Sequence, residues 1–537
     1  MCMKKSSSNT VAMMRWSSIV EHIIKAASYT YFCNWSVTRA MNSHHTIAIS
    51  YSSATVFYSF VGIYTLWMVK NELDLIVKRI QRKLPPGYLG FPIIREIQFI
   101  RSISSSSGVM KSLHEKRSRY GSLFAQYFIG GGTNIVAGGQ EDLNWLFNND
   151  RKALTEVAWP PNIVMLLGPG AVANQTGKYH RVLRRLLEPY FAPKFVENYL
   201  NCMHETTSDE LESWCKTGEF LSSEVFKMYA LRLFYVSAFG NVDEEMMASL
   251  HDDFKIWLGG FLSLTTKQVP GTSFTEAMKA RDRILNTVDT LIDKFMSENP
   301  ENSERAQITI IGRLIYGKDK DNNRVMTRDE MKDNILNLIF AGHDTTYASI
   351  STLLYHLSEN KDAMDALTDE VTKLSDSLTA DELRNAPVLN ACLHESWRVD
   401  PPVPGSFRKA VKELNHKGYS FDAGTVFNYS ILMAVTDENL YKRYEKFDMR
   451  RFLPEDHPLY CQDIDSGIDP FQGRSSYPIF GGGTHVCLGK AFAQLELRVL
   501  AARLLREYKV EVRNPKKVAF PVNGWNIEFK LTRRKDL

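Results

Sequence analysis

The stretch that decides the fold is Phe480-Gly-Gly-Gly-Thr-His-Val-Cys487-Leu-Gly489-Lys490, about fifty residues before the C-terminus. Because glycine tolerates positive φ, such a loop can bring the Cys487 sulfur close to a flat ligand. The apolar spacing from Lys490 to Tyr508 predicts a helix directly after the loop. A helix N-terminus favours thiolate over thiol, and a thiolate in this setting suits an axial ligand of heme iron.

Two other interpretations of this loop need to be weighed. A phosphate-binding loop is excluded, because Gly483 and Gly489 are separated by five residues where that motif needs four, and Ala491 replaces the required Ser or Thr. A buried structural cysteine in a glycine-bearing turn is the other alternative. Three further motifs in the chain favour the heme ligand over it.

The segment Ala341-Gly-His-Asp-Thr-Thr346 interrupts a long helical pattern that runs from Thr327 to Glu359. Thr327 and Glu330 have the spacing of a capping box, which predicts the start of this helix. An acid followed by an alcohol is unusual at mid-helix, because both are mediocre helix formers. A polar kink with a bound water is one interpretation, and a pair that delivers protons is the other.

A third motif is Glu395-Ser-Trp-Arg398, in which a spacing of three places both charges on one helix face. A solvated surface ion pair is the simplest interpretation of this pattern. The proline-rich residues 399–404 follow and predict an abrupt end of the helix.

These motifs together resemble the cytochrome P450 family. Phe480, Gly483, Cys487 and Gly489 match its heme loop, Phe-x-x-Gly-x-Arg-x-Cys-x-Gly, with His485 in place of the Arg. The segment 341–346 matches the family's oxygen-activating helix motif at every fixed position. The resemblance runs from about residue 84 to about residue 530 and implies a fold that is mainly α with small β-sheets.

The resemblance implies heme b as the cofactor, with Cys487 as its axial thiolate ligand. It also implies basic contacts to the heme propionates. The candidates are His485, whose charge would depend on pH near neutrality, Arg408, and the pair His180 and Arg184, which stands where the family commonly has Trp-x-x-x-Arg.

The same resemblance assigns roles to the other two motifs. Gly342 would leave space for dioxygen beside the heme, and Thr345 and Asp344 would manage proton delivery. Glu395 and Arg398 would form a buried triad with Arg451 of the segment 447–452, which supports cofactor binding and is costly to break.

Between the motifs, amphipathic spacing predicts helices over 192–217, 220–240 and 273–298, and short strands are expected near 122–137 and 405–430. By resemblance, residues 159–170 would lie over the distal face of the heme. Within them, Ile163, Met165 and Leu166 are either pocket-lining or ordinary core residues.

The composition supports a sizeable apolar core. The 537 residues are 44% apolar with a formal net charge of +4, which gives no reason to expect a nucleic-acid partner. Seven cysteines are scattered without a CxxC pair, so a zinc site is unsupported. An odd, sparse set of cysteines indicates a reducing compartment.

The N-terminal region has a different character. Residues 1–45 are basic and rich in Ser and Thr, as in a targeting or luminal segment, and residues 46–69 carry no charge and have the length of one transmembrane anchor. A cleaved targeting sequence is the alternative. Residues 70–92 are basic and then Pro-rich, which predicts a hinge, and residues 93–537 would form the heme-thiolate catalytic domain. We expect a single-pass protein of the endoplasmic reticulum, with a plastid as the alternative, and a catalytic domain on the cytosolic side.

The sequence therefore predicts a membrane-bound monooxygenase that uses dioxygen to oxidise an apolar small molecule. Electrons would come from NADPH through a cytochrome P450 reductase or a ferredoxin-type donor. The form of residues 84–92 looks most like the branch with retinoid and steroid hydroxylases, which suggests an isoprenoid, sterol or retinoid-like substrate. Two alternatives are a heme-thiolate isomerase or dehydratase that needs no reductase, and a non-catalytic heme-binding sensor. The intact pair Asp344 and Thr345 argues against both.

Overall fold

The computed structural model describes residues 62–63, 66–67, 69–70, 73–88, 108–128, 132–240, 243–263, 265–319, 321–464, 467–468, 475–518 and 522–536. The predicted segment 1–45 lies outside these residues, as does most of the predicted anchor 46–69. Within the described part of the chain, no helix is both long and apolar enough to cross a bilayer.

The chain divides into two compact units. The smaller comprises residues 1–86, 91–94 and 415–421. Its described part contains a helical stretch over residues 73–80 and most of the hairpin of β7 (Leu414–His416) and β8 (Tyr419–Phe421).

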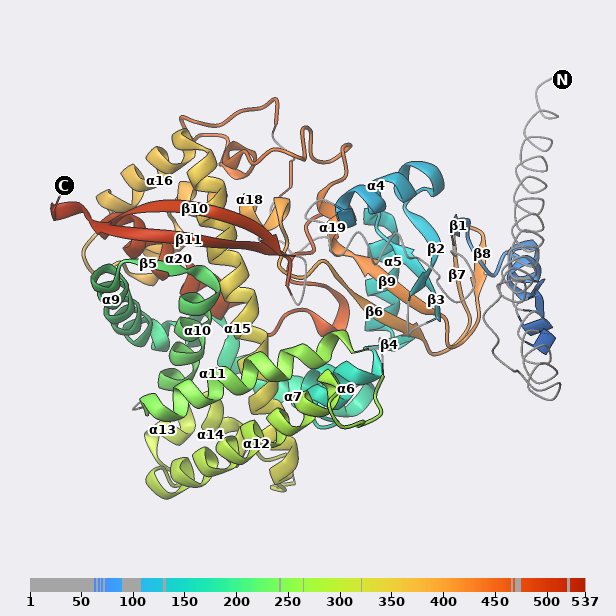
Figure 1. The fold of residues 1–537 in the computed structure, drawn as a ribbon, viewed down its shortest axis with the longest axis horizontal. Coiled ribbons are helices and arrows are strands. Elements are labelled where there is room, and N and C mark those ends of the chain that lie inside the picture. The colour runs from blue at the N-terminus through green and yellow to red at the C-terminus, as the bar shows by residue number, and fades with distance from the viewer. Residues whose placement is uncertain are drawn as a thin grey trace, which may run out of the picture. The chain divides into compact units, whose positions relative to one another are not determined.

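The larger unit is organised around α15 (Arg328–Glu359), the long helix that is yellow in Figure 1. Thr327 and Glu330 form the predicted capping box at its start. The helices that pack against α15 include α10 (Ser222–Phe239), α12 (Ser273–Glu298), α18 (Pro387–Val399) and α20 (Lys490–Glu507). Because α15 is covered on several sides, its apolar residues are buried all around it rather than along one stripe.

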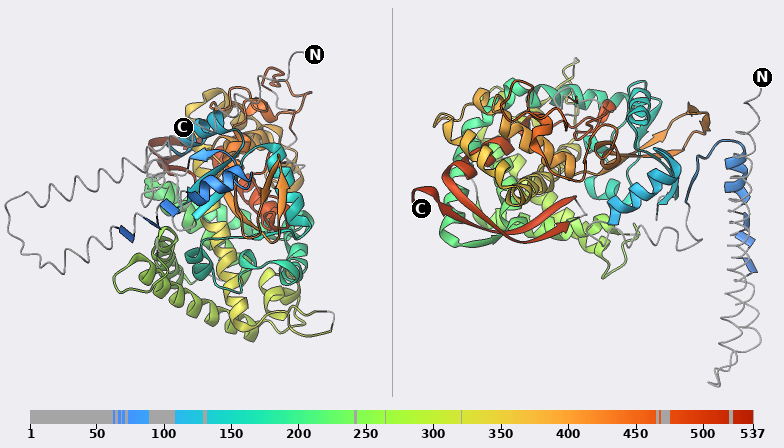
Figure 2. Two further views of the ribbon diagram at one scale, coloured as in Figure 1. Left: turned by 90° about the vertical axis from the view of Figure 1, so that its right-hand side faces the viewer. Right: turned by 90° about the horizontal axis from the view of Figure 1, so that it is seen from above.

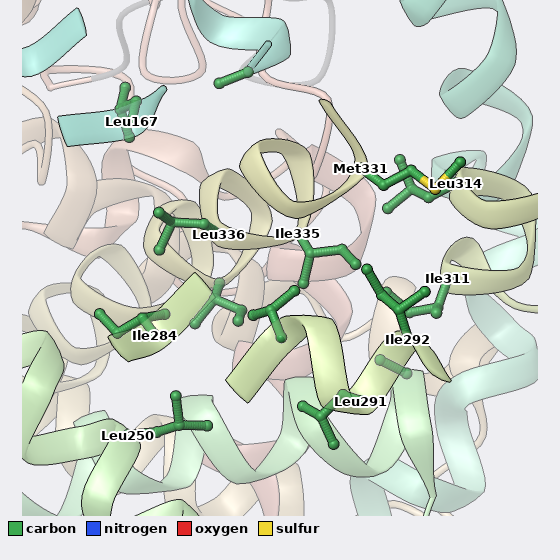
Figure 3. Close-up of a cluster of buried hydrophobic side chains, with 14 of the residues drawn as sticks. Leu167, Leu250, Ile284, Leu291, Ile292, Ile311, Leu314, Met331, Ile335 and Leu336 are labelled. Atoms are coloured by element: carbon green, nitrogen blue, oxygen red, sulfur yellow. The ribbon is translucent and has the colours of Figure 1, made fainter. Parts of the chain in front are cut away.

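A large apolar cluster packs on the N-terminal half of α15, where Ile335 and Leu336 are fully buried (Figure 3). Many of its other members come from α6 (Pro161–Leu167), α11 (Glu244–Leu258), α12 and α14 (Ile310–Tyr316). Leu166 belongs to this core, whereas the neighbouring Met165 is 37% exposed. Ile163, Met165 and Leu166 were each expected to line either a pocket or the core, and Leu166 belongs to the core.

Two sheets complete the larger unit (Figure 2). A six-stranded sheet has the order β1-β2-β3-β9-β6-β4 and a three-stranded sheet has the order β10-β11-β5. Along β6, alternate residues are buried, which turns Ser406, Arg408 and Ala410 to the interior. The strands are β1 (Gly87–Tyr88), β2 (Leu123–Phe128), β3 (Gly132–Ala137), β4 (Thr155–Val157), β5 (Glu219–Leu221), β6 (Gly405–Ala410), β9 (Val426–Ser430), β10 (Tyr508–Val518) and β11 (Gly524–Arg533).

The remaining helices surround this framework and agree with the predicted mainly α fold. The predicted helix after the cysteine loop is α20, which ends at Glu507 so that Tyr508 begins β10. The proline-rich stretch ends α18 at Val399, as predicted. The other helices are α4 (Gly108–Tyr120), α5 (Gln140–Arg151), α7 (Gly177–Leu187), α8 (Pro193–Val196), α9 (Leu200–Thr217), α13 (Glu304–Ile308), α16 (Lys361–Lys373), α17 (Ala380–Arg384) and α19 (Ile431–Val435).

The packing of α20 on α15 buries a carboxyl group and makes a pH dependence testable. Glu496 of α20 is 4% exposed and accepts a hydrogen bond from Thr346 Oγ1 at 3.2 Å. Burial raises the pKa of Glu496 to about 8, although this hydrogen bond opposes the shift. The native state therefore holds a proton that the unfolded chain releases between about pH 4.5 and pH 8, and stability falls as pH rises through that window.

We expect Glu496→Gln to remove this contribution, because glutamine keeps the acceptor without the titration. Its free energy of unfolding in urea, relative to wild type, should increase by about 1 kcal/mol for each pH unit across the window. Glu276→Gln, at an exposed position, is the control and should give a difference that does not change with pH. A constant difference for Glu496→Gln would contradict the assignment.

Candidate heme-thiolate site

The loop that carries Cys487 is fastened to the end of α5 by Asp150. The Asp150 carboxylate accepts hydrogen bonds from the Thr484 backbone N–H at 2.6 Å and from Thr484 Oγ1 at 2.9 Å. Gly483 has φ +73°, and a Cβ at this position would lie 2.2 Å from Asp150 Oδ2. Gly483 is therefore required both by its backbone conformation and by the close approach of α5.

Within the loop, the Cys487 N–H donates to the Phe480 carbonyl oxygen at 2.8 Å and closes the turn. The Phe480 ring packs edge-on against Trp397 of α18 with ring centroids 5.4 Å apart. Trp397 Nε1 in turn donates to Ser349 Oγ of α15 at 3.0 Å. The loop, α18 and α15 are thus held in one connected arrangement around the cysteine.

The Cys487 side chain is exposed, although protein groups surround it closely enough to desolvate its thiol. Desolvation raises the pKa of its thiol above the usual value, and this outweighs the opposing effects of the Gly489 N–H and of Arg184 and Lys490. The expectation that the loop alone favours thiolate is therefore wrong. Coordination by a metal ion deprotonates a thiol outright, so ionisation would accompany heme binding.

The predicted propionate contacts are found in different surroundings. Arg408 is 1% exposed, donates from Nη1 to the Phe407 carbonyl oxygen at 2.9 Å, and lies 3.4 Å from Asp150. Its Nε and Nη2 are buried without a hydrogen-bond partner among the described residues. Arg184 instead donates to the Val486 carbonyl oxygen at 3.0 Å, one residue before Cys487, and pairs with Glu188.

The two predicted histidines stack on each other, with the rings of His180 and His485 3.9 Å apart and 16° from parallel. His485 Nε2 lies 3.0 Å from the Gln175 carbonyl oxygen, and Nδ1 lies 3.0 Å from Thr484 Oγ1. Burial, with His485 and Arg184 nearby, lowers the pKa of His180 to about 3, so this ring is neutral at physiological pH. The stacked rings thus connect the cysteine loop to α7 as well as to α5.

The middle of α15 opens on one side. Ala341 and Gly342 are exposed on a helix that is otherwise largely buried, and a Cβ on Gly342 would have nothing within 4 Å. Thr345 Oγ1 donates to the Ala341 carbonyl oxygen at 2.6 Å. The helix thus presents backbone and one hydroxyl group to open space at the predicted position of dioxygen.

Asp344 is buried and turned toward other partners than Thr345. Its Oδ2 lies 3.1 Å from His343 Nδ1, and its Oδ1 lies 2.5 Å from Lys227 Nζ of α10. Burial by itself would raise the pKa of Asp344, but His343 and Lys227 hold it below its usual value. The acid is therefore ionised at neutral pH, within a network that reaches a second helix.

The structure brings the predicted supporting triad together. Arg398 donates to both Glu395 oxygens, from Nε at 2.7 Å and from Nη2 at 2.9 Å, and Arg451 Nε lies 3.3 Å from Glu395 Oε2. All three side chains are fully buried. The guanidinium groups also donate to backbone carbonyl oxygens of residues 435, 442, 444, 446 and 464, which fixes the chain between α18 and the cysteine loop.

Sequence reasoning missed Asp150, Lys227 and His251. Asp150 and Thr484 are 334 positions apart, and Lys227 and Asp344 lie on different helices, so no local spacing connects them. His343 stood inside a predicted motif but was given no role.

Comparison with known proteins agrees with this arrangement. Residues 85–535 match the family model described as Cytochrome P450. A putative cytochrome P450 120 from Synechocystis sp. is 30% identical over 430 residues, covering 79% of this chain and 90% of the relative. Taxane 13-alpha-hydroxylase from Taxus cuspidata is 26% identical, covering 77% of this chain and 83% of the relative. A retinoic acid-bound structure of cyanobacterial CYP120A1 superposes with a TM-score of 0.72 at 27% identity, covering 84% and 99% of the two chains.

The fold and the cysteine loop define a heme-thiolate oxygenase. The residues present fit that group: Cys487 and Gly342 are accessible, Gly489 faces open space, and the buried Arg408 Nη2 lacks a partner among the described residues. The chain belongs to the cytochrome P450 family and is a P450 monooxygenase.

The buried triad should be necessary for heme retention. We expect Glu395→Gln to leave two guanidinium groups buried without their counter-charge, which costs roughly 3–5 kcal/mol. The protein should then lose heme on gel filtration, measured as the ratio of Soret to protein absorbance. Glu244→Gln removes the partner of Arg232 at an exposed position and is the control. Full heme content and unchanged stability in Glu395→Gln would contradict a supporting role.

Proposed function

We propose that this chain oxidises an apolar isoprenoid-type small molecule, with dioxygen as co-substrate and electrons from NADPH. The observation that carries the proposal is the open turn of α15, where Gly342 and Thr345 face accessible space and Asp344 joins a buried charge network behind them. Proton delivery to a reacting oxygen needs a donor with this placement.

The bound heme would supply the activation of dioxygen, and the residues of this chain would prepare it. Cys487 would hold the iron, and Phe480, Gly483 and Gly489 would shape the loop around it. Arg408 has a buried nitrogen, Nη2, without a partner in the described part of the chain, and it could donate to a propionate. Thr345 would donate a hydrogen bond toward the reacting oxygen, and Asp344, which is ionised at rest, would pass on the proton that replaces the one that Thr345 gives.

The names of several relatives support the substrate class that the form of residues 84–92 suggests. One structural neighbour is titled as bound to retinoic acid, and relatives are named taxane 13-alpha-hydroxylase and abscisic acid 8'-hydroxylase. These names share apolar, terpenoid-derived small molecules. Retinoic acid is therefore the first compound to test.

The electrons would come from a partner, as the family membership over residues 85–535 implies. Lys178, Arg181 and Arg185 are exposed on α7. The same helix places Arg184 on the Val486 carbonyl oxygen beside Cys487. A basic surface so close to the ligand loop would favour an acidic reductase or ferredoxin-type donor.

An isomerase or dehydratase that needs no reductase is the second candidate. It would have no use for a donor at Thr345 or for the charged network behind it. The placement of both residues on the open turn of α15 favours the monooxygenase.

We expect the dithionite-reduced protein to give the long-wavelength carbon monoxide difference band of thiolate-ligated heme, and Cys487→Ser to lose it. With retinoic acid, NADPH and a cytochrome P450 reductase, wild type should form an oxygenated product. Thr345→Ala should lower product per NADPH roughly tenfold and release hydrogen peroxide instead, because proton delivery contributes on this scale or above. Thr372→Ala, at an exposed position, is the control. Turnover that needs no reductase and is the same in Thr345→Ala as in wild type would favour the reductase-independent candidate.

We also propose that residues 46–69 anchor the protein in the endoplasmic reticulum membrane. The stretch is uncharged, and the helical residues that follow it expose Leu73, Val77 and Ile80 at 55%, 47% and 66%. A single anchor followed by basic residues leaves the catalytic domain in the cytosol.

Deletion of residues 1–69 should move the protein from the carbonate-resistant microsomal pellet to the supernatant, because the apolar span is lost. Deletion of residues 1–45 alone is the matched control and should leave it in the pellet. Import of the full chain into plastids, with loss of the N-terminal region, would contradict the proposal.

A further inference from the structure

A second polar network extends from Asp344 away from the open turn of α15. Figure 1 shows α10, α11 and α15 in the same region, and all three contribute to it. His343 is 2% exposed and its Nδ1 lies 3.1 Å from Asp344 Oδ2. Its other ring nitrogen, Nε2, is buried and has no hydrogen-bond partner in the described part of the chain.

A second histidine faces this free nitrogen. The His251 ring of α11 lies with its centroid 6.0 Å from that of His343, at an interplanar angle of 58°. His251 Nδ1 is likewise buried without a partner among the described residues. Each of the two neighbouring rings thus has one buried nitrogen without a partner, and a bridging water molecule would satisfy both.

The other nitrogen of His251 points toward the surface. His251 Nε2 lies 3.6 Å from Glu224 Oε2, and the Glu224 side chain is 52% exposed. Glu224 also pairs with Lys255 at 2.7 Å. The groups that face His251 are thus Glu224 of α10, Lys255 of its own helix and His343 of α15. With a water molecule between the two histidine rings, these groups would form a sequence from solvent to Asp344.

We propose a proton relay through Glu224, His251 and His343, which carries protons from the surface to Asp344. The proposal rests on the proposed monooxygenase function and names further residues for it. Both histidines have the two-nitrogen geometry of a relay, in which one ring nitrogen accepts a proton and the other gives one up. Lys227 holds the second Asp344 oxygen, so the carboxylate stays oriented while His343 exchanges protons with it.

Electrostatics supports this role. Burial, with Lys255 and His343 nearby, lowers the pKa of His251, while Glu224 opposes the shift. His251 therefore rests as the neutral imidazole at neutral pH and carries a proton only during transfer. The alternative is that both histidines only fill space, since Phe254 packs on His343 with ring centroids 5.6 Å apart.

The reaction balance provides the test. Hydroxylation with a reductase follows RH + O2 + 2e− + 2H+ → ROH + H2O and takes both protons from solvent. With hydrogen peroxide as oxidant, RH + H2O2 → ROH + H2O takes none. A relay is needed for the first reaction only, whereas a packing role affects both.

Two variants separate proton transfer from hydrogen bonding. His343→Asn keeps a donor near the position of Nδ1 for Asp344 but has no second nitrogen to face His251. His251→Gln keeps a group near Nε2 for Glu224 but cannot pass a proton through. The matched control is His356→Gln, because His356 lies on the same helix and makes a similar buried contact, Nε2 to Asp400 Oδ2 at 3.0 Å.

With retinoic acid and reductase, each relay variant should lower product per NADPH about tenfold and raise hydrogen peroxide release. Peroxide-driven product should stay within about twofold of wild type. The control should behave as wild type in both assays. Equal losses in both assays, or no loss in either, would overturn the relay.

A measurement without turnover distinguishes this proposal from the proposed function. In the ferric protein labelled with ¹⁵N-histidine, NMR titration should show that Glu224→Gln lowers the pKa of His251 and that His343→Asn raises it. A His251 titration that is insensitive to both changes would overturn the relay even if turnover is normal. Failure of wild type to oxidise retinoic acid, with both NMR shifts present, would count against the proposed substrate and leave the relay supported.

Discussion

The ion-pair and hydrogen-bond set around Asp150 determines where the Cys487 sulfur lies. Burial by itself would raise the pKa of this carboxyl, but hydrogen bonding to His485, the charge of Arg408 and the Thr484 N–H lower it to about 2. The group is therefore a permanent anion at the end of α5. Because the same carboxylate meets the cysteine loop and the buried Arg408 of β6, one charge sets the position of the metal-ligand loop relative to the cation proposed for a propionate.

A second buried carboxylate, that of Glu395, holds the chain in place behind the loop. Glu395 is surrounded by Arg398 and Arg451, whose remaining donors are used by backbone carbonyl oxygens. Buried charges are costly unless every partner is present, so this arrangement tolerates little rearrangement. The two carboxylates thus make the ligand side of the site rigid, whereas the open turn of α15 provides space and exchangeable protons. Such a division suits a cofactor that must be held still while small reactants change beside it.

The parts of the structure that depend on local sequence could be predicted from it. The capping box at Thr327, the end of α18 before Asp400 and the helix after Cys487 follow from neighbouring residues, and all are present. The parts that depend on contacts between distant segments could not. Asp150, Lys227 and His251 have ordinary sequence surroundings and acquire their roles only when three helices meet the motifs. The prediction that the loop alone favours the Cys487 thiolate is wrong for a related reason. The helix N-terminus is visible in the sequence, but the desolvation that outweighs its effect on the thiol pKa is not.

The charge balance around Asp344 also decides the form in which protons can approach it. Asp344 Oδ1 pairs with Lys227, and Asp344 Oδ2 lies 3.1 Å from His343 Nδ1. Each histidine ring can accept a proton at one nitrogen while it releases one from the other, so a proton can pass through the interior by way of these rings and a bridging water. Glu224 meets the opposite condition at the surface, where the hydrogen bond from Lys255 holds the pKa of its carboxyl below the usual value and solvent supplies the protons. The exposed fraction of the side chain falls from Glu224 to His251 to His343, which is the order in which a proton from solvent would pass them.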